Sequence, residues 1–413
     1  MSESISDFRV EELFFSRTDE RGVILAGNSV FARVAKYSVD QLIGAPHKTI
    51  RHPDMPRAVF WLLWHTIQQG RPIGAYVKNR AQDGSIYWVY AIVTPFQGGY
   101  LSVRLKPTSA MLEVIEREYA DLRAAEREQD LEPEESAKLL LARLAELGWK
   151  DYGAFMTQAL VTETTARSEA LAARNVTNAE RPCALERMSR EGTKISSALL
   201  GKLSHVGSFP INLQIQASKL STGGKLFNAV AENYSRLCAK ITRQLETFSK
   251  SSEEVAGSVS EGLFKLLASR YQGEVIEQFR REEGQTGAGS SCADREAEIA
   301  RLAAQREAFL GEVLAGLDDI ASDCQVFRRH TSEMYALVTC LTATQTIGLI
   351  ESARLDEAGR TLNAMISEVT EVQRDAAAKI KSLAALNDEI GELTRALSAE
   401  FRGDRRYASS GCP

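Results

Sequence analysis

Hydrophobic and polar residues follow two different patterns along the chain, and the change falls near Pro107. Before Pro107, short apolar runs alternate with glycine, proline and other turn residues, as in antiparallel strands joined by short helices. After Pro107, long stretches rich in Ala, Leu, Glu, Lys and Arg contain little proline, as in long helices packed into bundles. The pattern therefore predicts a small α+β domain followed by an all-α region.

The N-terminal region predicts five antiparallel strands and three short helices. A turn at residues 19–22 marks a first hairpin, and Asp83-Gly84 and Gly98-Gly99 mark two further turns. The strands are expected at residues 14–15, 23–25, 73–80, 86–96 and 100–105, and the helices at residues 29–36, 39–43 and 56–69. Helices lying over one face of such a sheet leave a pocket.

The helical region divides where the helical pattern breaks. Arg181-Pro182 interrupts it once, and glycine and serine remove any helical preference from EGQTGAGSSC at residues 283–292. The expected segments are connecting helices at residues 108–182, a first helical hairpin at 183–283, a Gly/Ser-rich loop at 284–292, a second helical hairpin at 293–402 and a disordered tail at 403–413.

A repeat lies inside this helical region. Residues 215–233 (IQASKLSTGGKLFNAVAEN) align without a gap with residues 350–368 (IESARLDEAGRTLNAMISE) at a constant offset. Each copy crosses a short polar stretch that ends in glycine, at residues 221–224 and 356–359, and then resumes a helical pattern. Because glycine readily ends a helix, each copy is expected to be the tip of an antiparallel hairpin. The two hairpins could form a four-helix bundle within one chain or pair in a homodimer.

Composition narrows the class of protein. The chain has 413 residues, of which 44% are hydrophobic, and its six cysteines are scattered with no C-x-x-C pair. Neither a disulfide framework nor a metal site is therefore predicted. No window approaches about 18 uninterrupted apolar residues, and the N-terminus lacks a signal-peptide pattern. We expect a cytoplasmic protein without membrane insertion.

The net charge of −5 conceals an asymmetry. Residues 1–107 carry 13 basic and 9 acidic residues, or +4, which leaves −9 for the remainder. The N-terminal region could therefore hold an anionic ligand, whereas the acidic remainder argues against nucleic acid as a partner.

A proline-braced loop, PHKTIRHPDMP at residues 46–56, holds the strongest candidates for ligand binding. Arg51 offers a planar fork suited to a diphosphate, and His52 can donate to an oxygen or titrate near neutral pH. Trp64 supplies an aromatic wall for a flat ring. The remaining candidates carry a carboxylate or an amide and are Asp54, Asn28 and Asn79.

Each of these candidates also has a purely structural interpretation. Trp64 could belong to the core, and Asn28 and Asp54 could cap helices. Arg51 and His52, adjacent in one rigid loop, are harder to explain in this way. An empty or differently occupied pocket stays open, while haem is disfavoured because no axial ligand stands out among five histidines.

Three strings in this region carry a family resemblance, namely residues 16–31 (SRTDERGVILAGNSVF), 46–64 (PHKTIRHPDMPRAVFWLLW) and 77–95 (VKNRAQDGSIYWVYAIVTP). Together they resemble the PAS domain of bacterial aerotaxis receptors over nearly all of residues 8–107. The resemblance agrees with the order of strands and helices above. It implies a domain that binds FAD non-covalently and reports the redox state of FAD.

The second copy of the repeat resembles the hairpin tip of methyl-accepting chemotaxis proteins, and the first copy is a more degenerate version. In that family the tip binds a coupling protein and a histidine kinase. The resemblance implies a partner-binding role for Lys219, Gly224, Lys225, Arg354, Glu357, Gly359 and Arg360. Asp356 and Thr361 stand where the family has glycine, which leaves kinase control in question.

The sequence favours a redox or oxygen sensor in which FAD in the pocket alters groups such as Asn79 or Tyr90, and the helices carry the change to the hairpin tips. The alternative is an interaction scaffold in which the PAS domain and the hairpins only dock partners. The sequence shows no phosphate-binding loop and no pairing of a nucleophile with a base, so it does not predict an enzyme.

Overall fold

A computed structural model describes residues 4–172, 180–204, 209–217, 224–282, 292–354 and 357–410. The chain forms two compact units. Unit 1 comprises residues 1–183, 260–316 and 401–413, and unit 2 comprises residues 184–259 and 317–400.

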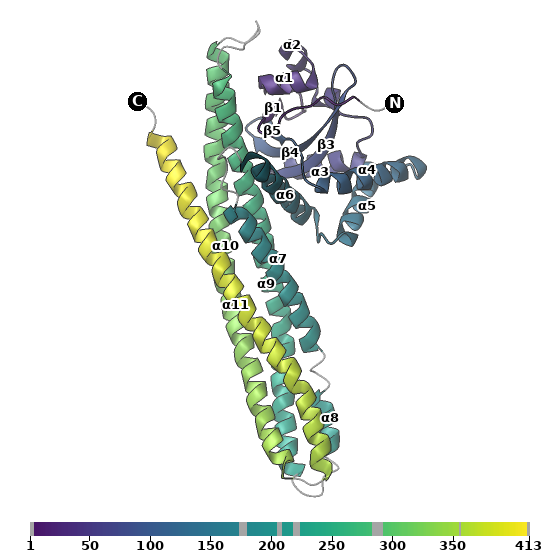
Figure 1. Cartoon of the computed structure of the whole chain (residues 1–413), viewed down its shortest axis with the longest axis vertical. Coiled ribbons are helices and arrows are strands. Elements are labelled where there is room, and N and C mark those ends of the chain that lie inside the picture. Colours follow the sequence, from purple (N-terminus) through teal and green to yellow (C-terminus); the bar gives the residue numbers. More distant parts are fainter. Residues whose placement is uncertain are drawn as a thin grey trace. The chain divides into compact units, whose positions relative to one another are not determined.

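The N-terminal part of unit 1 contains the expected antiparallel sheet of five strands (Figure 1). The strands are β1 (Phe14–Asp19), β2 (Ile24–Gly27), β3 (Ile73–Arg80), β4 (Ile86–Phe96) and β5 (Gly99–Leu105). They lie in the order β2-β1-β5-β4-β3, so the first hairpin pairs with the last strand. The predicted fold class is confirmed, and the predicted strands match to within a few residues.

Short helices cover one part of this sheet. They are α1 (Ser29–Ala35), α2 (Val39–Leu42) and α3 (Arg57–Ile67), together with a 3-10 helix η1 (His47–Ile50) that the sequence pattern did not predict. The Asn28 side chain accepts a hydrogen bond from Phe31 N, which confirms Asn28 as the cap of α1. Ser38 and Gln41 form a capping box that starts α2.

Three connecting helices follow the sheet, as expected for residues 108–182. They are α4 (Met111–Glu128), α5 (Pro133–Glu146) and α6 (Tyr152–Ala172). Pro133 opens α5 at a position where the missing N–H costs nothing. The α6 carboxylate of Glu163 accepts hydrogen bonds from the Tyr76 hydroxyl at 2.7 Å and from Thr108 N at 2.7 Å, which fixes α6 against β3.

Long helices make up the rest of the described chain, and they are α7 (Glu180–Ser204), α8 (Phe209–Ala217), α9 (Gly224–Arg281), α10 (Cys292–Ser352) and α11 (Glu357–Ser410). Buried residues recur along α10 at alternating steps of three and four: Leu310, Val313, Leu317, Ile320, Cys324 and Phe327. This spacing keeps one apolar seam on one side of a helix, as in coiled coils.

Contacts between the long helices in unit 2 follow antiparallel pairing. Asn233 pairs with Thr344, and Gln244 pairs with Glu333. The mean residue number is about 288 in both pairs, as expected for two antiparallel helices. Gln345 donates to Ile366 O, and Asn387 donates to Cys324 O. These two pairs share a mean residue number of about 355, so α10 and α11 are also antiparallel. Helix α10 therefore runs antiparallel to both α9 and α11 in unit 2.

The helices of unit 2 pack within one chain. Lys202 of α7 pairs with Asp375 of α11 at 2.7 Å, and Phe248 of α9 lies against Phe327 of α10 with ring centroids 5.2 Å apart. The structure differs from the expected disordered tail at residues 403–413, because α11 continues to Ser410. Residues 403–410 contain no proline, so no residue among them blocks the continuation of the helix.

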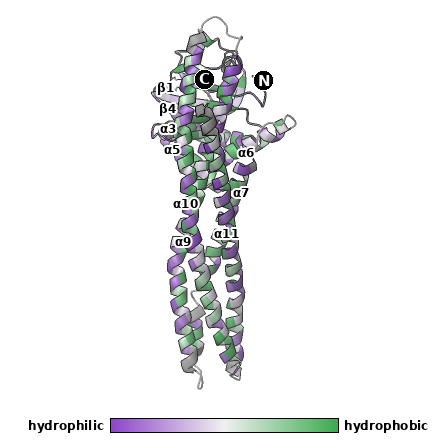
Figure 2. Cartoon of the chain, turned by 90° about the vertical axis from the view of Figure 1, so that its left-hand side faces the viewer, coloured by the Kyte–Doolittle hydropathy of each residue, from purple (hydrophilic) through white to green (hydrophobic). Residues whose placement is uncertain are grey.

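No helix of the described residues is both long enough and apolar enough to cross a membrane. Figure 2 shows hydrophilic residues at short intervals along each long helix.

Candidate ligand cavity

A cavity of about 370 Å³ lies between the sheet, the loop around η1 and helix α3. Strand residues alternate between the two faces of a sheet, so only every second residue can reach this cavity. The strand residues that line it are Thr18, Val77, Asn79, Ala91, Val93, Tyr100, Ser102 and Arg104. The other lining residues are Arg21, Gly22, Pro46, His47, Lys48, Arg51, Phe60, Leu63, Trp64 and Ile67.

Trp64 forms part of the cavity wall, as the sequence suggested. Its ring meets Tyr100 edge-on, with centroids 5.5 Å apart. Gly22 has a left-handed backbone with φ of 80°, and a Cβ at this residue would lie 3.2 Å from the Trp64 ring. The β1–β2 turn therefore needs glycine at residue 22 for its conformation and for the close approach of the indole.

Arg51 lies at the edge of the cavity and is half-buried. Its guanidinium stacks over the Phe60 ring at 3.6 Å, and its backbone bridges to Asn79. Burial lowers the pKa of Arg51, and the Glu126 carboxylate opposes that shift. An outer groove of about 400 Å³ shares Arg51, Phe60 and Trp64 with the cavity. Arg51 therefore borders both the cavity and the outer groove.

Asn79 lies in the cavity wall with only 2% of its surface exposed. Its amide nitrogen Nδ2 has no hydrogen-bond partner among the described residues. Leaving a buried amide donor unpaired costs about 1–3 kcal/mol. A buried, unpaired donor in a cavity wall is suited to contact an acceptor atom of a ligand.

Arg104 and His47 form a polar pair in the cavity that the sequence reasoning missed. Arg104 is 2% exposed and donates to His47 Nε2 at 2.5 Å and to Ser16 Oγ at 2.9 Å. Because a guanidinium can only donate, His47 Nε2 must be the acceptor, and the imidazole must be neutral. Burial and the Arg104 charge lower the pKa of His47 to about 3, and burial lowers the pKa of Arg104 to about 10. Arg104 is therefore charged at neutral pH.

The lining residues carry charge of one sign. Four of them are basic, namely Arg21, Lys48, Arg51 and Arg104, and none is Asp or Glu. Arg21 pairs with Asp19 at 3.3 Å outside the lining, and Lys48 is exposed. A positively charged cavity with aromatic and aliphatic walls suits a flat ligand that carries negative charge.

The other three candidates lie outside the lining of the cavity. Asn28 is buried, and its amide donates to Leu13 O at 3.1 Å and accepts from Phe15 N at 3.2 Å. His52 is buried, and its Nδ1 accepts from Asp54 N at 3.2 Å. Asp54 is half-exposed and pairs with Arg127 of α4 at 3.2 Å. Successive residues of the loop thus point in different directions.

The opposite face of the sheet packs against helices α6, α9 and α10 within unit 1. Phe15 of β1 meets Phe279 of α9 with centroids 5.1 Å apart. Arg17 makes two contacts with Glu298 of α10, at 2.6 and 2.8 Å. Tyr90 also lies on this face, where its hydroxyl donates to Met156 O of α6 at 2.5 Å. The expectation that Tyr90 reaches the ligand is therefore wrong.

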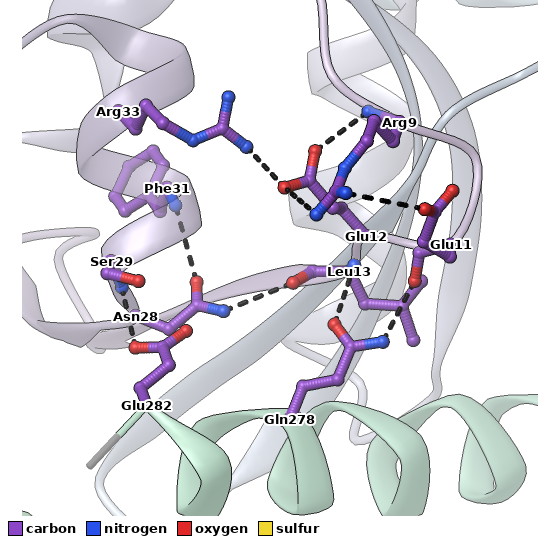
Figure 3. A network of polar contacts seen from close by, with 10 residues as sticks. All are labelled: Arg9, Glu11, Glu12, Leu13, Asn28, Ser29, Phe31, Arg33, Gln278 and Glu282. Carbon is purple, nitrogen blue, oxygen red and sulfur yellow. Dashed lines mark hydrogen bonds and ion pairs between the residues drawn. The ribbon is translucent and has the colours of Figure 1, made fainter. Parts of the chain in front are cut away.

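A polar network joins the start of the domain to the end of α9 (Figure 3). Gln278 accepts from Leu13 N at 2.9 Å and donates to Glu11 O at 2.9 Å. One turn later, Glu282 accepts from Ser29 N at 3.0 Å, at the first turn of α1. The side chains of α9 thus hold the segment before β1 and the N-terminus of α1 together.

The described residues reach the expected tips only in part. Arg354 is exposed and pairs with Glu351 at 2.8 Å, and Arg360 is exposed on α11. Gly224 and Glu357 are the first residues of α9 and α11. Residues 218–223, which include Lys219, and residues 355–356 lie outside the described residues, and nothing is described of the surroundings of Lys225, Glu357 and Gly359.

Comparison with known proteins identifies the N-terminal domain. Residues 24–102 match the PAS fold family. The aerotaxis receptor of Escherichia coli (strain K12) is 38% identical over 114 residues, which cover 26% of this chain and 22% of the receptor. The nitrogen fixation regulatory protein of Klebsiella pneumoniae is 32% identical over 80 residues, which cover 19% of this chain and 16% of that protein. The chain thus begins with a PAS domain similar to that of the aerotaxis receptor, and the match spans about a fifth of that receptor.

Two solved structures align with part of this chain. A PAS domain from Colwellia psychrerythraea is 23% identical and aligns over 23% of this chain and 86% of its own, with a TM-score of 0.21. The light state of the Aureochrome1 LOV photoreceptor is 23% identical over 29% of this chain and 92% of its own, also with a TM-score of 0.21.

Proposed function

We propose that this protein is a redox sensor whose PAS cavity binds FAD and whose helices pass the signal on in a chemotaxis-type pathway. The observation that carries the proposal is the cavity itself, which combines four basic residues, no acidic residue and the unpaired amide of Asn79. FAD has a flat ring with carbonyl acceptors and a diphosphate, and these groups complement such a lining.

In this proposal, different residues of the cavity contact different parts of FAD. Trp64 and Tyr100 offer aromatic surface to the ring system, and Asn79 Nδ2 offers a donor to a ring carbonyl. Arg51 offers a fork to the diphosphate, and the outer groove beyond it offers space for the rest of the dinucleotide. When bound, flavin supplies reversible electron transfer, which no side chain in the cavity supplies.

The route out of the cavity runs through the sheet. On β1, Thr18 faces the cavity, while its neighbour Arg17 faces α10. On β4, Val93 faces the cavity, and the next residue, Thr94, accepts a 2.9 Å hydrogen bond from Gln272 of α9. A shift of either strand would move residues that touch α9 and α10. We therefore propose a direct route to these helices, in addition to the connecting helices after Pro107.

The proposed output lies at the hairpin tips. The similarity to the aerotaxis receptor covers 26% of this chain and 22% of the receptor, so a chemotaxis coupling protein or histidine kinase as partner follows from the repeat and its resemblance. Arg354 and Arg360 are exposed and available to a partner. Binding of a coupling protein should be lost in Arg354→Glu and kept in Arg395→Glu, which changes an exposed arginine on α11 that is 41 residues further along the chain. Equal binding by both variants would favour the scaffold alternative.

The cofactor is tested with matched tryptophan variants of the full chain. Purified protein should be yellow, with flavin absorption bands, and should release FAD on denaturation. Trp64→Leu should retain at least tenfold less FAD, because it removes a cavity wall. Trp149→Leu is the control, since Trp149 packs edge-on against Phe155 with ring centroids 5.2 Å apart and lines neither the cavity nor the outer groove. Colourless protein that gains no FAD on reconstitution would refute the proposal.

A further inference from the structure

Arg104 is a buried cation that the proposed contacts to FAD leave unexplained. Within the described residues its guanidinium donates to neutral acceptors, namely Ser16 Oγ, Ser102 O and His47 Nε2. The guanidinium also lies 5.6 and 5.3 Å from the ring centres of Phe14 and Phe31. No carboxylate of the described chain forms an ion pair with it. Proteins rarely bury an arginine without a negative partner, because desolvating the charge is costly.

The position of Arg104 directs its charge into the cavity. It lies on β5 beside Ser102, two residues along the same face, and both line the cavity. The neutral His47 holds the guanidinium in place without cancelling its charge. Because Arg104 is buried, solvent screens its charge less than it screens the charges of Arg21 and Lys48 at the surface.

We propose that Arg104 raises the reduction potential of the bound flavin by favouring the redox state that carries more negative charge. This inference rests on the proposed function. Two electrons from a reductant and one proton from solvent leave the reduced ring with one negative charge that the oxidised ring lacks. A fixed positive charge nearby lowers the free energy of the charged state more than that of the neutral state. Arg104 then adjusts the reduction potential, and the binding of oxidised FAD depends on Arg104 less than the binding of reduced FAD does.

Two pairs of variants separate charge from shape. Arg104→Lys and Arg104→Gln differ in the charge at residue 104. His47→Gln and His47→Glu both remove the imidazole, and only the glutamate places a negative charge beside the guanidinium. The ratio of the affinity for oxidised FAD to the affinity for reduced FAD should be at least tenfold higher in Arg104→Gln than in Arg104→Lys. The same ratio should be at least tenfold higher in His47→Glu than in His47→Gln. For a two-electron couple, tenfold corresponds to a potential about 30 mV lower.

The measurement is a potentiometric titration of FAD-loaded full-length variants with dithionite as reductant, accompanied by the dissociation constants of FAD in both redox states. Lower potentials in Arg104→Gln and His47→Glu, with tighter relative binding of oxidised FAD, support the inference. Equal potentials within both pairs, with FAD bound, overturn it and leave the sensor function standing. If Arg104→Gln does not fold, the His47 pair decides. Wild-type protein that binds no FAD overturns both proposals.

Discussion

Arg17 and Glu298 are 281 residues apart in the chain and form a two-point ion pair between strand β1 and helix α10. Their side chains are only 13% and 7% exposed. The planar guanidinium and the carboxylate meet at two contacts, which fixes the angle as well as the distance between the sheet and the helix. A strand that borders the ligand cavity is thereby tied to a helix that runs into unit 2.

Breaking this pair should destabilise unit 1 strongly. Glu298→Gln should cost about 3 kcal/mol, because the buried Arg17 loses its carboxylate partner. Arg17→Met should cost less, because Glu298 keeps its contact with Arg301 at 3.3 Å. The double variant should cost less than the sum of the two single variants. Urea unfolding followed by tryptophan fluorescence measures this, since Trp61, Trp64, Trp88 and Trp149 all belong to unit 1.

An exposed ion pair provides the comparison. Arg328 and Asp388 pair across α10 and α11 with side chains 61% and 47% exposed. Arg328→Met should change the free energy of unfolding by less than about 1 kcal/mol. Circular dichroism follows this unfolding, because Arg328 and Asp388 lie in unit 2 and the four tryptophans lie in unit 1. Similar losses at the buried and the exposed pair would show that burial does not set the strength of the Arg17–Glu298 contact.

Gly22→Ala should damage both stability and ligand binding. The left-handed backbone at residue 22 costs a non-glycine residue about 1 kcal/mol, and the new methyl group would displace Trp64. Gly84 is a matched control, because it has φ of 85° in another hairpin turn and open space where its Cβ would lie. Both variants should lose similar stability, and only Gly22→Ala should lose FAD affinity. Equal FAD affinity in the two variants would exclude Trp64 as a cavity wall that the ligand needs.

Asn79→Leu should affect stability and ligand binding in opposite directions. Removing the unpaired amide should stabilise the ligand-free protein by about 1 kcal/mol, while FAD affinity should fall at least tenfold. Asn79→Asp keeps the shape, lacks the donor and should lose affinity without gaining stability. Thermal unfolding without FAD and titration with FAD give the two quantities. Unchanged affinity in both variants would remove Asn79 from the site.

The fold was predictable from the sequence where local pattern decides it. Alternating strands, the turns at Gly22 and Gly84, and the cap at Asn28 depend on residues close together in the chain. The site was predictable only in part. Arg51, Trp64 and Asn79 line the cavity, whereas His52 and Asp54, which are close to Arg51 in the sequence, do not line it.

The missed features depend on long-range packing. Arg104 alternates with apolar residues along β5, and such a pattern does not predict that its side chain is buried. Its contact with His47 joins residues 57 positions apart. The pairing of Arg17 with Glu298 requires α10 to fold back onto the N-terminal domain, which no local periodicity encodes.

The low pKa of His47 predicts a dependence of stability on pH. The folded state keeps His47 neutral down to a pKa of about 3, whereas the unfolded state takes up a proton below about 6.5. Stability should therefore fall as the pH drops from about 6.5 towards 3, by up to about 1.4 kcal/mol per pH unit from this residue. Above pH 6.5 the residue should have no such effect. Urea unfolding of wild type and His47→Gln at pH 7 and pH 5 isolates the effect, and identical pH dependence in both would contradict it.

In the proposed sensor, a redox change in the cavity reaches α9 and α10 through the sheet. Hydrogen–deuterium exchange of the FAD-loaded full chain, compared between oxidised and reduced protein, tests this most directly. We predict altered exchange in β1 and β4 and, with them, in the helix segments around Gln272 and Glu298 that contact these strands. Exchange that changes around the cavity but stays the same in both helix segments would contradict the proposed route from ligand to helix.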